Sequence, residues 1–137
     1  MSGISHEKVK NRILVGRFFI IAGLVFGSVS PGHAEEVSKE IWVNTMKTAL
    51  PNAFCQKLEF FRECFDVNED QCIEAAALAT RICLHKYINQ IPDTLIQPKD
   101  GAKWGNVIGQ CAGENFHQTL GRLFKNTKEC NNMDFWN

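Results

Sequence analysis

The residues best suited to specific chemistry in this sequence are its cysteines. An even number of cysteines is typical of a disulfide framework when a chain is small and exported. No two of them form the C-x-x-C pair of a zinc site or thiol redox motif, and the C-x-x-C-H motif of c-type haem attachment is missing. Three disulfides are therefore predicted, with one pair of free or catalytic thiols as the alternative. The cysteines are Cys55, Cys64, Cys72, Cys83, Cys111 and Cys130.

A short acidic segment, DVNEDQ, resembles the start of a calcium-binding loop. Asp66, Asn68 and Asp70 occupy the first, third and fifth positions of such a loop. Gln71 stands where the sharp turn needs glycine, and Ala77 stands where a bidentate glutamate belongs. We therefore interpret Asn68 and Gln71 as a capping box that opens a helix.

The remaining candidates for catalysis or metal binding are few. His85 and His117 lack the spacing of a metal-binding pair, and Ser38 is the only serine after residue 34. We expect Ser38 to cap a helix rather than to act as a nucleophile. No phosphate-binding, dinucleotide-binding or G-x-S-x-G motif occurs. The sequence therefore predicts no enzymatic activity, no cofactor and no bound metal.

The first 34 residues have the order of a secretory signal peptide. A basic segment precedes the apolar stretch FFIIAGLVFGSV, and small residues end at Ala34. An uncleaved anchor is the alternative, but the apolar stretch is far shorter than the roughly 20 residues that span a bilayer. We expect cleavage between Ala34 and Glu35, export to the periplasm or beyond the cell, and no stable membrane span afterwards. Residues 35–137 then form a single disulfide-rich helical domain.

Removal of the signal leaves an acidic domain. It takes away four of the 15 Lys and Arg residues and one of the 15 Asp and Glu residues, which leaves 11 against 14. The domain then has no basic stripe of the kind that binds nucleic acid, so we expect no nucleic-acid partner.

Apolar periodicity predicts an all-α fold, a small bundle of about four helices held together by three disulfides. Pro51 should end or kink the first helix. In the second, Phe54, Leu58, Phe61 and Phe65 form an apolar stripe that we assign to the core. A proline-containing loop over 90–102 joins the last two. The expected helices are 39–50, 52–65, 69–89 and 103–125.

Three glycines interrupt the apolar face of the last helix. Gly105, Gly109 and Gly113 recur every four residues, although each costs about 1 kcal/mol relative to alanine. We expect them to admit the alanine-rich third helix, with Gly109 at the closest approach. The alternative is that they open a channel for a ligand.

The disulfide pairing follows in part from heights along the helices. Cys83 and Cys111 should lie level on antiparallel neighbours, and we expect them to bond. Cys72 and Cys83 lie roughly 16 Å apart along one helix, too far for a disulfide. For the other four cysteines we expect Cys64–Cys72 and Cys55–Cys130. The main alternative is Cys72–Cys130 with Cys55–Cys64.

Two apolar segments are candidate partner contacts. Leu95 and Ile96 lie in the proline loop, and Phe135 and Trp136 end the chain. Aromatic side chains are typical interface anchors, whereas the alternative is that both segments fold onto the core. We therefore predict an exported, non-enzymatic module that binds another protein, such as an inhibitor, immunity factor or secreted effector. The second hypothesis is a carrier of a small apolar ligand or lipid in a cavity between helices, and the third is a hydrolase with an unrecognised site.

Overall fold

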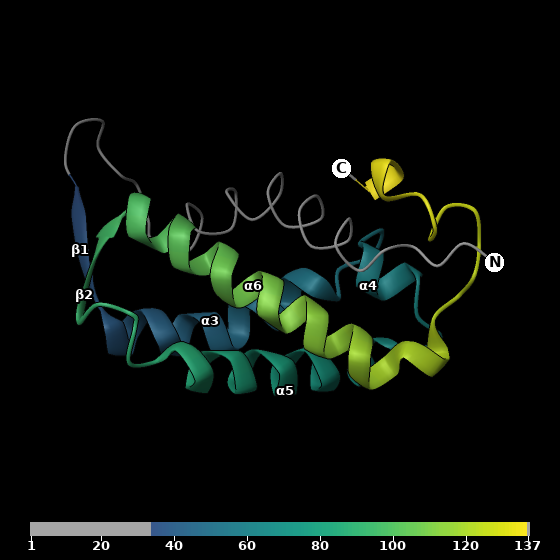
Figure 1. Cartoon of the computed structure of the whole chain (residues 1–137), viewed down its shortest axis with the longest axis horizontal. Coiled ribbons are helices and arrows are strands. Elements are labelled where there is room, and N and C mark those ends of the chain that lie inside the picture. The colour runs from purple at the N-terminus through teal and green to yellow at the C-terminus, as the bar shows by residue number, and fades with distance from the viewer. Residues whose placement is uncertain (1–33, 137) are drawn as a thin grey trace.

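The computed structural model describes residues 34–136, so all of the expected signal peptide except Ala34 lies outside this range. The described chain forms four α-helices, a two-stranded sheet and two 3-10 turns, which confirms the predicted disulfide-linked helical bundle (Figure 1). In chain order the elements are β1 (Glu35–Ser38), α3 (Lys39–Phe54), α4 (Phe60–Glu63), α5 (Glu69–Tyr87), β2 (Thr94–Gln97), α6 (Lys99–Leu120), η1 (Gly121–Leu123) and η2 (Met133–Trp136).

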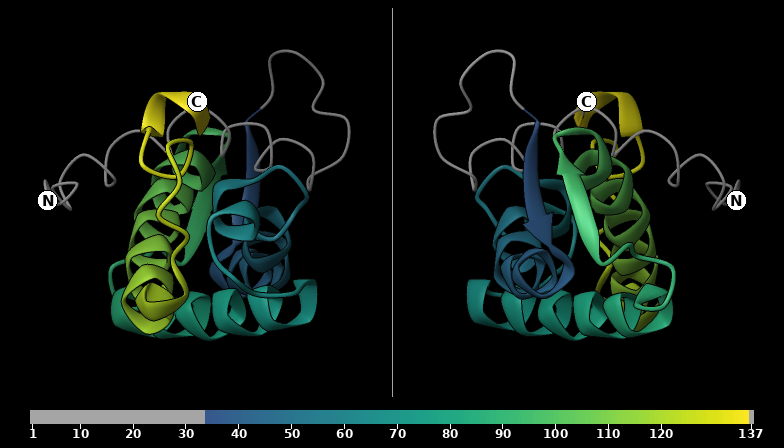
Figure 2. Two further views of the ribbon diagram at one scale, coloured as in Figure 1. Left: turned by 90° about the vertical axis from the view of Figure 1, so that its right-hand side faces the viewer. Right: turned by 90° about the vertical axis from the view of Figure 1, so that its left-hand side faces the viewer.

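Helix α5 is the base on which the other long helices rest. Both α3 and α6 pack extensively on α5 and make few contacts with each other. Figure 2 shows α5 running across the bottom, with α3 and α6 above it and its lower side bare. The small sheet and the C-terminal turn η2 lie toward opposite ends of the molecule (Figure 1).

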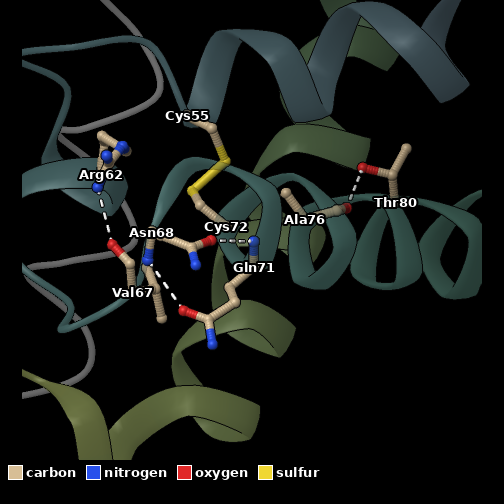
Figure 3. Close-up of a disulfide and its surroundings, with 8 residues drawn as sticks. All are labelled: Cys55, Arg62, Val67, Asn68, Gln71, Cys72, Ala76 and Thr80. Atoms are coloured by element: carbon tan, nitrogen blue, oxygen red, sulfur yellow. Dashed lines mark hydrogen bonds between the residues drawn. A yellow bond between two sulfur atoms is a disulfide. The ribbon is translucent and has the colours of Figure 1, made fainter.

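The capping box predicted at the start of α5 is confirmed. The Asn68 side chain accepts a hydrogen bond from the Gln71 N–H at 2.9 Å, and the Gln71 side chain accepts one from the Asn68 N–H at 2.9 Å (Figure 3). Two of the N–H groups that a helix start leaves unpaired are thereby satisfied. Further along α5, Thr80 is fully buried. Its hydroxyl donates a hydrogen bond to the Ala76 carbonyl at 2.7 Å, which satisfies this polar group away from water (Figure 3).

The expectation of a continuous second helix over 52–65 is wrong. Helix α3 begins with Ser38 as its cap, continues through Pro51 and ends at Phe54. A loop follows, and α4 is a single turn. Leu58, assigned to the core from the stripe, lies in this loop with φ of 69° and 77% of its surface exposed. The break lets α4 turn relative to α3, so that Phe54 and Phe60 are both buried.

The chain between α5 and α6 is more ordered than the expected loop. Its residues 94–97 form β2, which pairs antiparallel with β1, with Val37 opposite Leu95. Both of these side chains are buried. The Ile96 N–H donates to the Asp100 carboxylate at 2.8 Å, which ties β2 to the first turn of α6. The sheet thus pins the start of the domain to the helix that follows β2.

Three disulfides cross the fold, and only the pair Cys83–Cys111 was expected from the sequence. The expected Cys64–Cys72 and Cys55–Cys130 pairs are wrong, and so is the alternative set. The observed bonds are Cys55–Cys72 and Cys64–Cys130. The physical reason is the break after α3: Cys55 caps α3 beside the first turn of α5, whereas Cys64 caps α4 and faces the C-terminal segment. Figure 3 shows the Cys55–Cys72 bond joining the two helix ends.

Two of the three α6 glycines, Gly105 and Gly113, do not meet α5 as we expected. Gly109 is buried, and its place at the closest approach to α5 stays a prediction. The nearest neighbours of a β-carbon on Gly113 would be Phe61 and Phe54, and one on Gly105 would meet nothing within 4 Å.

Candidate functional site

Of the two candidate contacts in the proline loop, the structure buries Leu95 and leaves Ile96 exposed. Leu95 is fully buried on β2, so its expected role as a partner contact is wrong. Ile96 points the other way along the strand and is 38% exposed. Sheet pairing decided this outcome, because alternation along a strand sends neighbouring side chains to opposite faces.

The C-terminal segment is held in place by several contacts. Cys130 is bonded to Cys64 and is almost completely buried. The indole N–H of Trp136 donates to the Glu129 carbonyl at 2.8 Å, and its ring meets Phe60 edge to face at 5.8 Å between centroids. The second half of the segment therefore folds back onto α4.

Phe135 is the exception within this segment. Its ring is 60% exposed and meets the Trp136 ring at 5.0 Å between centroids. Its N–H donates to the Asn132 carbonyl at 3.1 Å, which fixes the turn that carries it. We call Phe135 together with the half-buried Trp136 the tail surface. The Phe135 ring is thus exposed to solvent, although hydrogen bonding holds the backbone that carries it in a defined turn.

Leu58, which the apolar stripe assigned to the core and not to a contact surface, is the most exposed large apolar side chain of the described residues. It lies two residues before Phe60, the ring that contacts Trp136. Its N–H donates to the Glu63 carboxylate at 3.1 Å, which holds the loop in its left-handed turn. Leucine rarely adopts a positive φ, and no signal in the sequence indicates this conformation.

The histidines do not form a catalytic or metal-binding group. The His117 ring packs edge to face on Phe65 at 5.6 Å and lies 5.5 Å from Phe124, whereas His85 is exposed on α5. Among residues 34–136 no three His, Cys, Asp or Glu side chains are grouped to hold a metal ion. Over the same range, no helix is long and apolar enough to cross a membrane.

Asp93, whose carboxyl has a lowered pKa, lies at the end of the molecule that carries the sheet, far from the tail surface. Asp93 pairs with Lys39 at 2.7 Å, and the hydrogen bond and charge of Lys39 lower the pKa of the Asp93 carboxyl. Asp93 is fully exposed, and the Lys39 N–H also donates to its carbonyl at 2.8 Å. This pair fastens the start of α3 to the segment before β2.

The tail surface consists of two neighbouring aromatic side chains, Phe135 exposed and Trp136 half-buried. Its aromatic rings can bury area against another molecule, and a preordered backbone lowers the entropy cost of doing so.

Comparison with known proteins gives one match. A sequence model described as "T2SS substrate NttA" matches residues 36–122, more than half of the chain. No curated protein and no solved structure matches at a significant level. The matched range begins in β1 and ends in η1, so it includes α3, α5 and α6 together with the sheet. The chain therefore belongs to the NttA family of T2SS substrates and is an exported, secreted protein.

Proposed function

We propose that the mature chain works after secretion as a non-enzymatic module that binds another protein through the tail surface. The observation that carries this proposal is Phe135, 60% exposed on a segment that is otherwise held down. Apart from that ring, a disulfide, an indole hydrogen bond and a ring contact with Phe60 all fix the segment. Exposed aromatic rings on ordered backbone are the usual energetic centres of protein interfaces.

The test compares capture by three forms of the oxidised mature chain. The parent, Phe135→Asp and Leu123→Asp are immobilised and exposed to the extracts that the secreted protein would meet. Leu123 is the matched control because it is also exposed, at 41%, on the separate turn η1. We expect the parent and Leu123→Asp to capture the same specific protein and Phe135→Asp to fail to capture it. Equal retention by all three forms, or by none, contradicts the proposal.

A second candidate function, carriage of a small ligand, has one observation in its favour. Both amide atoms of Gln97 are buried without a hydrogen-bond partner in the described part of the chain. The Gln97 side chain lies against Gly101, and one turn further along α6 a β-carbon on Gly105 would meet open space. A ligand that offers a donor and an acceptor beside an apolar group would satisfy that amide.

Native mass spectrometry of the mature chain, purified from culture medium, tests the second candidate. A bound molecule that is present in the parent and lost in Gly105→Leu supports it. The ligand proposal is contradicted if the parent and Gly105→Leu both show only the mass of the chain itself. The two functions are distinguishable, because Phe135→Asp leaves Gln97 and Gly105 unchanged.

We also propose that the secreted form begins at Glu35. Strand β1 begins at this residue, so cleavage after Ala34 leaves every described element intact. The family match also begins after this point. N-terminal sequencing of the protein in the medium tests the position, and any start within β1 contradicts it because that cut would remove strand pairs.

A further inference from the structure

The side of α5 turned away from the core carries a strip of five residues, two of which are large apolar side chains that the described chain leaves exposed. Leu78 and Ile82 are each 47% exposed there. Gln71, Ala75 and His85 continue the same line, and the steps between these five residues are four, three, four and three. This is the spacing of a seam through which one helix packs on another. The exposure of Leu78 and Ile82 places the strip on the side of α5 away from α3 and α6, and Figure 2 shows no described helix or strand beyond that side.

Charges are distributed unevenly along the exposed side of α5. Its first half carries Glu69, Asp70 and Glu74, and its last turns carry basic side chains. The basic group consists of Arg81, His85 and Lys86. A second α5 laid in the same direction would place like charges together. Laid in the opposite direction, it places the acidic half of each helix over the basic half of the other.

We propose that two copies of the mature chain associate through α5, antiparallel and about a twofold axis. The axis passes near Leu78, so that the Leu78 side chains of the two copies meet across it and Ala75 of each copy lies nearly level with Ile82 of the other. A twofold interface uses the same patch on both copies, and this patch is complementary to itself in charge. The proposal is independent of the tail surface, which lies on a different face.

The pairing makes a definite prediction about two charged residues. Glu74 and Arg81 each lie one position before a seam residue, so they flank the same side of the strip. In an antiparallel pair related by a twofold axis, like flanks meet. Glu74 of each copy therefore faces Arg81 of the other, and two such contacts form.

The interface is small, which sets the expected affinity. The 19 residues of α5 make a strip about 28 Å long at 1.5 Å per residue. Such a strip falls at the low end of specific interfaces, below about 1,200 Å² of total buried surface. We therefore expect a dissociation constant on the order of 0.1 mM.

Sedimentation equilibrium of the oxidised mature chain over about 10 µM to 1 mM measures this association. We expect the parent to dimerise at the upper end and Leu78→Asp to remain monomeric throughout. Ile41→Asp is the matched control, because Ile41 is 57% exposed on α3 and lies outside the strip. It should dimerise as the parent does. Circular dichroism establishes that each variant is folded.

Two charge reversals test the antiparallel arrangement. Glu74→Lys alone and Arg81→Glu alone each place like charges opposite each other, and each should weaken self-association roughly fivefold. An equimolar mixture of the two variants places opposite charges at every contact between unlike copies. The mixture should therefore dimerise at least as well as the parent. A parent that stays monomeric at 1 mM, a dimer that survives Leu78→Asp, or a mixture no stronger than its components overturns the proposal.

Discussion

Gly113 of α6 and Phe61 of α4 approach so closely that a β-carbon on Gly113 would lie 3.1 Å from Cζ of Phe61. Phe61 has little room to move, because it is buried and its ring stacks on Phe54 at 4.4 Å between centroids. One helical face thus contains a glycine that packing requires and, two turns earlier, Gly105, beside which nothing lies within 4 Å.

Substitution of these two glycines by alanine should have opposite effects on stability. Alanine gains about 1 kcal/mol of helix propensity at either position. At Gly113 the crowded Phe61 ring should cost about 1–3 kcal/mol, so Gly113→Ala should be neutral to destabilising by about 2 kcal/mol. At Gly105 only the gain remains, so Gly105→Ala should raise the free energy of unfolding by about 0.5–1 kcal/mol. Urea unfolding of both oxidised variants measures the difference, and a more stable Gly113→Ala would contradict this packing.

The disulfide between Cys64 and Cys130 should matter most for the C-terminal segment. It closes a span of 66 residues, against 17 for Cys55–Cys72. In the chain-entropy estimate their removal costs about 4 and about 3 kcal/mol respectively. We expect amide exchange over residues 131–136 to accelerate in the Cys64→Ala, Cys130→Ala double variant, since that bond holds η2 onto α4.

The Cys55→Ala, Cys72→Ala double variant is the control for local loosening. It should lower global stability while leaving exchange in η2 slow under native conditions. Equal acceleration in the two double variants would mean that the tail depends on global stability rather than on its own disulfide.

Replacing Leu58 by glycine should stabilise the fold. Its φ of 69° is costly for leucine and free for glycine. The side chain is 77% exposed, so its loss removes little packing. We expect Leu58→Gly to raise the free energy of unfolding by about 0.5–1 kcal/mol, measured by urea unfolding. Leu58→Ala keeps the strain and should show no such gain; a gain there would refute the role of φ.

The pair formed by Lys39 and Asp93 should contribute to stability only where Asp93 is ionised. Lys39 lowers the folded-state pKa of Asp93 below its usual value of 3.8. The contribution is therefore complete above the unfolded-state pKa and is lost as pH falls through the folded-state pKa. The unfolding midpoint of Asp93→Asn should lie below that of the parent at pH 7, and the two should converge in strong acid. Because Asp93 is exposed, 1 M salt should also reduce the difference, and a difference independent of pH would assign the effect to another cause.

The sequence by itself determined the class of the fold and several local features. The periodicity of apolar residues indicated helices, and Asn68 with Gln71 marked the start of α5, because capping is decided by residues three positions apart. The level positions of Cys83 and Cys111 on neighbouring helices followed from helix rise alone.

Only the tertiary structure decided the features that depend on contacts distant in sequence. Strands β1 and β2 are four residues each and lie far apart in the chain, so neither carries a signal strong enough to indicate the sheet that buries Leu95. Because the helix breaks before α4, Cys55 bonds to Cys72 and Cys64 bonds to Cys130. The same break leaves Leu58 exposed, although the stripe had assigned it to the core. A helical stripe records which residues share a face only while the helix continues, and whether it continues is settled by the energy of packing and disulfide bonds across the whole domain.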